Sequence, residues 1–120
     1  MSAAERFAQR ISQIKGVDRF VLTRQDGQIV THNLSNPEQL ASVVTLGGYG
    51  AQAVQDSVGF SPFRYLVCTR PESRNLIIFP LDKYFLGIQQ KPDTSQGELV
   101  GEVGRFLQHI LSRRKDSGNG

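Results

Sequence analysis

The sequence predicts a single-domain, three-layer α/β/α fold whose middle layer is a five-stranded, mainly antiparallel sheet. Three observations support this prediction. Helical and strand periodicities follow the order α-β-β-α-β-β-β-α along the chain. The strand-like runs are joined by turns of a few residues, which only antiparallel neighbours allow. The runs LIIF and YFLGI are apolar at successive positions, so helices must cover both faces of their sheet.

The N-terminal part is expected to form a helix and a hairpin. AAERFAQRISQIKG carries apolar residues at helical spacing and reaches Gly16, in the position that ends helices. RFVLTR and QIVTHN are two β-rich runs on either side of Gln25-Asp26-Gly27, and Asp-Gly between such runs indicates a tight turn. QIVTHN is the more polar of the two, so it suits an edge of the sheet.

The C-terminal part is expected to supply three strands and a last helix. FRYLVCTR, NLIIFP and KYFLGIQQ are the strands, the last two joined by a turn at Leu81-Asp82, and the two more apolar ones belong inside the sheet. GELVGEVGRFLQHILSRR is an amphipathic helix. Its apolar face consists of Leu99, Val103, Phe106, Leu107, Ile110 and Leu111. We expect the domain to span residues 1–112 and a disordered basic and polar tail to span 113–120.

Composition argues against several classes of function. The formal net charge is +3, but the basic residues are scattered, which does not favour a nucleic-acid partner. No apolar run approaches 18 residues, so membrane insertion is not expected. The N-terminus MSAAERFAQR is charged where a secretory signal is apolar, which predicts a cytoplasmic protein. Cys68 is the single cysteine, and its place in YLVCT predicts a buried thiol that acts as a small hydrophobe.

The residue types that carry catalysis show no specific arrangement. His32 and His109 each lack a second ligand at metal spacing, and no H-E-x-x-H, G-x-S-x-G or Walker motif is present. Arg64, Arg70 and Arg74 flank two strands, where a solvated rim is a simpler interpretation than an arginine finger. We therefore expect no enzyme, no cofactor and no metal site.

The stretch LGGYGAQA, residues 46–53, allows two incompatible interpretations. Gly48 to Ala53 matches the G-x-G-x-x-G/A turn that binds the pyrophosphate of a dinucleotide, with residues 43–46 as the preceding strand and Arg70 facing a 2′-phosphate. This interpretation predicts a small NADP-binding protein. Its context is unfavourable, because a Rossmann unit needs further parallel strands with helical crossovers.

The alternative is one continuous helix over residues 38–58, which begins after the capping sequence Ser35-Asn36-Pro37. Three rows of residues recur at helical steps of three and four. The row expected to face the sheet is Leu40, Val44, Gly47, Ala51, Val54 and Val58. A polar row consists of Glu38, Ser42, Thr45, Tyr49, Gln52 and Asp56. A second apolar row consists of Val43, Leu46, Gly50 and Ala53.

The glycines in this helix need a compensating contact. Each costs about 1 kcal/mol relative to alanine, or roughly 3 kcal/mol for the three. A missing Cβ lets the sheet or another helix approach closely, which offsets that cost through dispersion contacts. Because the second apolar row has no partner within the chain, it predicts a partner outside the chain.

With this order of elements, the chain resembles the roadblock / dynein light chain family, including the bacterial GTPase-activating proteins of the gliding-motility type. The resemblance rests on IKGVDRFVLTRQDGQIVTHN, on the small-residue second helix and on NLIIFPLDKYFLGI, and it covers roughly residues 3–112. It implies a profilin-like fold and a dimer in which second helices pack side by side and third strands pair edge to edge.

The resemblance also implies positions for the dimer contacts. Helix pairing would use Leu46, Gly47, Gly50 and Ala53, beside Val43 of the same apolar row. Strand pairing would run along Arg64, Leu66 and Cys68. Family dimers commonly bind or regulate Ras-like small GTPases, or act as adaptors in larger assemblies.

Two hypotheses of different classes follow. In the first, the protein is a non-enzymatic dimer that regulates a small Ras-like GTPase, and the polar row of the second helix contacts the switch regions. The contact residues are then Ser42, Thr45, Tyr49, Gln52 and Asp56. Tyr49 is the expected anchor, because it is an aromatic residue in the middle of a polar stripe. In the second, the dimer is an adaptor whose partners do not depend on a nucleotide.

Overall fold

A computed structural model describes residues 2–58, 64–69 and 75–119, with backbone only for Val58 and 113–119. It confirms the predicted order of three helices and five strands. The elements are α1 (Ala3–Ser12), β1 (Val17–Arg24), β2 (Ile29–His32), α2 (Glu38–Val58), β3 (Leu66–Cys68), β4 (Leu76–Leu81), β5 (Tyr84–Gln90) and α3 (Gln96–Asn119).

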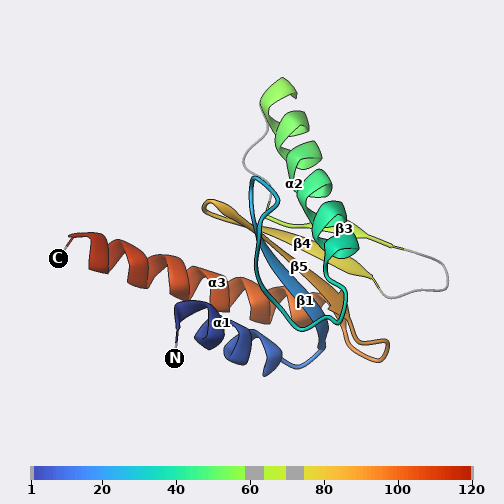
Figure 1. The fold of residues 1–120 in the computed structure, drawn as a ribbon, viewed down its shortest axis with the longest axis horizontal. Coiled ribbons are helices and arrows are strands. Elements are labelled where there is room, and N and C mark those ends of the chain that lie inside the picture. Colours follow the sequence, from blue (N-terminus) through green and yellow to red (C-terminus); the bar gives the residue numbers. More distant parts are fainter. Residues whose placement is uncertain (1, 59–63, 70–74, 120) are drawn as a thin grey trace.

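The strands form one antiparallel sheet in the order β2-β1-β5-β4-β3. The predicted interior positions of β4 and β5 and the edge position of β2 are confirmed. The register of β1 against β2 shifts between Leu22 and Thr23, so a bulge interrupts this outer pair. Helix α2 covers one face of the sheet and α1 and α3 cover the other, which gives the three predicted layers (Figure 1).

Both hairpin turns have the predicted local chemistry. In the β1–β2 turn Gly27 has a φ of 94°, which L side chains rarely adopt, and its N–H donates to the Arg24 carbonyl at 2.9 Å. The Asp26 carboxylate accepts from the Gln28 N–H at 3.0 Å. In the β4–β5 turn Asp82 has a φ of 53°, a region that aspartate tolerates better than most residues.

Each face of the sheet has its own apolar core, because alternate strand residues point to opposite faces. On the α1 and α3 side the core includes Phe20, Ile77 and Ile88 from the sheet, packed against Ile11 of α1 and Val103 of α3. The smaller core on the α2 side consists of Val21, Ala41, Val44, Leu76, Ile78 and Phe85. The sheet therefore separates the environment of α2 from that of the other two helices.

Helix ends differ from the predicted ones at two places. Helix α1 ends at Ser12, because the Gln13 and Ile14 N–H groups bond three residues back and tighten the chain before Gly16 turns it into β1. Helix α3 continues to Asn119, past Arg114, where the predicted helix ends, and past residue 112, where the predicted domain ends. The backbone shows no break at residue 112, and the disorder of 113–120 stays a prediction.

Candidate functional site

Helix α2 is only partly supported by its own chain. Its 21 residues make a rod about 31 Å long. The first half lies across the sheet, whereas the second half projects beyond it (Figure 1). This placement makes α2 the most exposed regular element on that side of the molecule and the candidate interaction site.

Small residues set the close contact between the first half of α2 and the sheet. Val44 is fully buried and packs directly onto Gly87 of β5, where no side chain would fit. A Cβ on Gly48 would lie 2.6 Å from the ring of Phe85, so any side chain at this position would have to displace the ring. Ala41 is buried one turn earlier. Two of the helix glycines, Gly48 and Gly47, therefore offset their helical cost by letting the sheet approach.

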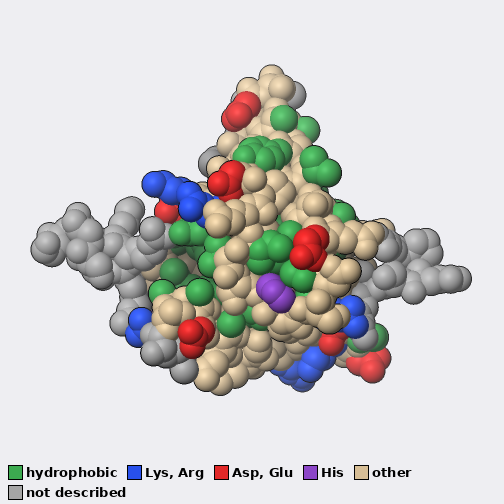
Figure 2. All heavy atoms as spheres, in the orientation of Figure 1, with side chains coloured by type: hydrophobic (Ala, Val, Ile, Leu, Met, Phe, Trp, Pro, Cys, Tyr) green, Lys and Arg blue, Asp and Glu red, His purple; other side chains and the backbone are tan. Residues whose placement is uncertain are grey.

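An exposed apolar ridge runs along another side of α2, visible as hydrophobic side chains on the projecting helix in Figure 2. It consists of Val43, Leu46, Gly50, Ala53 and Val54. Leu46 is 73% exposed and Val54 57% exposed, although both are large apolar residues. A Cβ on Gly50 would have no described atom within 4 Å, so nothing within the described chain accounts for a glycine at this position. Apart from Val54, the ridge is the second apolar row that the sequence predicts.

The sequence assigned Val54 to the sheet-facing row, and this assignment is wrong. The helical periodicity is correct, but Val54 is 57% exposed. It belongs to the second half of α2, which projects beyond the sheet (Figure 1). Val54 instead extends the ridge. The side chain of Val58, the next residue of the same row, lies outside the described residues.

The ridge lies on the same side of the molecule as the open edge of the sheet. A Cβ on Gly47 would meet Ile78 of β4 and Leu66 of β3, so this flank of α2 faces β3. Gly50 and Val54 follow Gly47 at steps of three and four and therefore share its flank. Among the described strands, β3 pairs only with β4. An apolar ridge and unpaired strand hydrogen-bonding groups thus adjoin each other.

The expected strand-pairing residues are partly engaged in the core. Leu66 and Cys68 are half-buried against the α2-side core, so Cys68 is less buried than the sequence predicts. Arg64 is exposed just before β3. The side chains of Leu66 and Cys68 face α2. Another strand could therefore pair with this edge through the outer backbone N–H and C=O groups of β3.

The polar row of α2 is more involved in local bonding than its sequence suggests. The Ser42 hydroxyl donates to the Glu38 carbonyl at 3.0 Å, and the Thr45 hydroxyl donates to the Ala41 carbonyl at 2.8 Å. Their oxygens remain as acceptors only. Gln52 is half-buried and Asp56 is exposed.

Tyr49 lies at the point where α2 leaves the sheet. Its ring meets the Phe85 ring edge-on, with centroids 5.8 Å apart, and the residue is 45% exposed. The contact with Phe85 holds the ring in place. Tyr49 therefore presents a positioned aromatic surface beside Thr45 and Gln52.

The dinucleotide interpretation is wrong. Residues 43–46 and 48–53 all lie inside α2, so neither the strand nor the glycine turn of a dinucleotide site exists, and Arg70 lies outside the described residues. In the described part of the chain, no group of three or more His, Cys, Asp or Glu is arranged to hold a metal ion. His32 and His109 lie on β2 and α3, and the His32 Nδ1 accepts from the Leu34 N–H at 3.0 Å.

No protein-family model and no curated protein matches the sequence, but solved structures do. A Roadblock/LC7 domain from Streptomyces avermitilis matches with a TM-score of 0.74 and 12% identity over 90% of this chain and 93% of that one. The chain has the roadblock/LC7 fold. The gliding protein MglB from Thermus thermophilus matches with a TM-score of 0.71 and 19% identity over 94% of this chain and 91% of that one. An MglB with a tetrameric arrangement matches with a TM-score of 0.72 and 18% identity over 94% of this chain and 90% of that one.

Profilin structures also match, which confirms the profilin-like fold class. All of these identities lie below 20%, so the likeness concerns the fold. Within the described residues, no helix of this roadblock fold is long and apolar enough to cross a membrane. The cytoplasmic location stays a prediction.

Proposed function

We propose that this roadblock-fold protein is a non-enzymatic homodimer that regulates a small Ras-like GTPase through its paired α2 helices. The observation that carries the proposal is the ridge of α2 beside the open β3 edge. In the proposed dimer two ridges pack against each other and two β3 strands continue one sheet. The MglB structure with a tetrameric arrangement supports self-association as a property compatible with this fold.

The ridge has the composition of a buried interface. Leu46 and Val54 would supply apolar area, since monomeric proteins rarely leave such a row uncovered. Gly50 would let the partner helix approach closely, which would explain a glycine that the described residues of its own chain do not explain. Val43 and Ala53 complete the contact on either side, with Gly47 at the flank toward β3.

The GTPase would contact the polar row, which stays accessible when the ridges are paired. Tyr49 would be the anchor, because its ring is already positioned by Phe85 and loses little freedom on binding. Ser42 and Thr45 would accept hydrogen bonds around it, Gln52 would accept or donate them, and Asp56 would meet a basic residue of the partner. Acceleration of GTP hydrolysis would come from ordering the switch regions and the attacking water, with no catalytic group from this chain.

The dimer is tested by measuring the mass of the wild-type protein and of Leu46→Glu by light scattering over a range of concentrations. Wild-type protein is expected at twice 13.3 kDa. Leu46→Glu should remain folded but weaken the dimer by about 30-fold or more, because a buried interface carboxylate costs at least about 2 kcal/mol. Leu111→Glu is the matched control, since Leu111 is an exposed leucine on α3. A wild-type monomer, or equal loss in both variants, would contradict the proposal.

GTPase regulation is tested by binding of a Ras-like GTPase loaded with GTP or with GDP. Preference for one nucleotide state is expected, with loss of binding in Tyr49→Ala. Equal binding of both states would favour the alternative, a dimeric adaptor whose partners do not depend on a nucleotide. That result would leave the dimer intact and reject only its regulatory role.

A further inference from the structure

The opposite face of the sheet carries an apolar cleft that the proposed dimer does not use. It has a volume of about 730 Å³ and lies between α1 and α3. Its floor includes Leu22 of β1 and Leu81 and Tyr84 at the β4–β5 turn. Val30 of β2 also lines it and is 37% exposed, although its neighbours on this face are buried. The cleft is therefore a place where apolar side chains of the described fold meet solvent.

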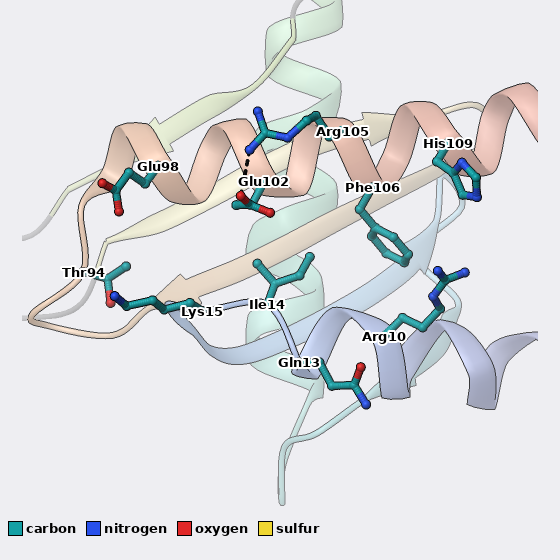
Figure 3. A pocket seen from close by; sticks show the side chains of 10 residues that line it. All are labelled: Arg10, Gln13, Ile14, Lys15, Thr94, Glu98, Glu102, Arg105, Phe106 and His109. Carbon is teal, nitrogen blue, oxygen red and sulfur yellow. Dashed lines mark hydrogen bonds and ion pairs between the residues drawn. The ribbon is translucent and has the colours of Figure 1, made fainter.

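Two aromatic rings form the wall between the helices. Phe7 of α1 and Phe106 of α3 lie with ring centroids 5.5 Å apart, and both are half-buried. The guanidinium of Arg10 lies over the Phe106 ring, 5.8 Å from its centroid. Figure 3 shows Arg10 reaching up from α1 while Phe106 and His109 point down from α3 toward it. These contacts hold a cation at the mouth of an apolar cleft.

The rim of this cleft is basic. Arg6, Arg10 and His109 line it, and none of its described lining residues is Asp or Glu. Neither Arg6 nor Arg10 forms an ion pair with another described residue. Further along α3 the helix continues into Arg113, Arg114 and Lys115. An anionic group entering the cleft would therefore meet cations that no carboxylate of the described chain neutralises.

A neighbouring cleft shows that this charge pattern is local. It has a volume of about 800 Å³, shares Arg10, Phe106 and His109 with the first cleft, and lies toward the other end of α1 (Figure 3). Glu98 and Glu102 line it, and Glu102 pairs with Arg105 at 2.8 Å. Lys15 and Arg105 line it as well, so that end carries charges of both signs, whereas the described lining beside Arg6 carries no carboxylate.

We propose that the cleft between α1 and α3 binds an acidic segment of another protein that carries apolar anchor residues. The apolar floor would bury the anchors, and the carboxylates of the segment would face Arg6 and Arg10. A concave cleft between two helices fits individual side chains better than it fits a flat lipid surface. This site lies across the sheet from α2, so it is independent of the proposed GTPase contact.

To test this, peptides are selected from a phage-displayed random library for binding to the 120-residue protein. The affinity of synthetic copies of the enriched peptides is then measured by fluorescence anisotropy. Enriched peptides should carry net negative charge and at least two large apolar residues. Arg6→Glu/Arg10→Glu should weaken their binding by about tenfold or more, because it reverses the rim charge. Val30→Glu, which places a carboxylate in the cleft, should weaken binding in the same direction.

Arg19→Glu/Arg24→Glu is the matched control, because it changes the net charge equally at two exposed arginines of β1 that are not among the residues lining the cleft. It should leave binding unchanged, and melting curves should show all variants folded. The proposal is overturned if no peptide is enriched, if enriched peptides are not acidic, or if the control loses binding equally. Binding of phosphatidylglycerol vesicles with the same dependence on Arg6 and Arg10, without peptide binding, would assign the site to a membrane surface instead.

Discussion

The two halves of α2 have similar small, apolar sequences and opposite environments. In the first half Val44 is fully buried and Gly48 touches the ring of Phe85. In the second half Val54 is largely exposed and Gly50 has no described neighbour where its Cβ would be. Valine and glycine therefore serve the fold on the sheet-facing side of the first half, and the same residue types in the second half remain available for a partner.

This difference shows that glycine has two different structural roles in one helix. Gly48 is required by contact with the protomer's own sheet, and its replacement should damage the fold. Gly50 has no such requirement in the monomer, and its replacement should damage only the proposed assembly. Substitutions placed in matched pairs across the two halves can separate these roles.

The largest expected effect comes from placing a carboxylate at equivalent apolar positions in each half. In a Leu46→Glu background, which is expected to weaken the proposed dimer, Val44→Asp should lose more than about 4 kcal/mol of unfolding free energy, because it buries an unpaired charge. Val54→Asp should change the same free energy by less than about 0.5 kcal/mol. Urea unfolding followed by circular dichroism measures both, and similar losses would refute the contrast between the halves.

Alanine at the two glycines, in the same Leu46→Glu background, should change the unfolding free energy by smaller amounts. The two changes should have opposite signs. Gly48→Ala should destabilise by about 1–2 kcal/mol, since overpacking against Phe85 exceeds the gain in helix propensity. Gly50→Ala should stabilise the monomer by up to about 1 kcal/mol, because the added methyl would meet no described atom within 4 Å. Thermal melts show directly whether each variant is more or less stable than its background. In the wild-type background Gly50→Ala should also weaken the dimer, and a tighter dimer would argue against close helix approach.

The smallest effect is expected at Tyr49, where the two halves meet. Tyr49→Ala should destabilise by about 1 kcal/mol through loss of the edge-on contact with Phe85. Tyr49→Phe keeps the ring and should stay within about 0.5 kcal/mol of wild type, which separates the ring's packing from the hydroxyl. Chemical unfolding of the two variants side by side provides the comparison. Equal losses would assign the effect to the hydroxyl.

The sequence predicts the fold well because most elements carry their own signals. Asp26-Gly27 specifies a hairpin by itself, and the continuous apolar runs of β4 and β5 place these strands inside the sheet. The bounds of α2 are predicted correctly, because three helical rows persist through the glycines. These signals are local, so a single sequence is sufficient to read them.

The site is predicted less completely, because it depends on where elements end relative to one another. Periodicity assigns Val54 to the sheet-facing row, but only the structure shows that the sheet does not reach it. The sequence gives no sign of what Gly48 contacts until Phe85 is found beneath it. The basic rim of the cleft between α1 and α3 has only a weak sequence signal. Arg6 and Arg10 lie on an amphipathic helix, and neither has a carboxylate three or four residues away on its C-terminal side.

The bulge between β1 and β2 bears on how many copies can join. A bulge twists an outer strand away from further pairing, so β2 is a poor template, whereas β3 pairs with β4 in an uninterrupted register and with no other described strand. Two copies joined through β3 would form a single ten-stranded sheet bounded at both ends by β2. Growth stops there, so this geometry favours a closed particle over an open fibre.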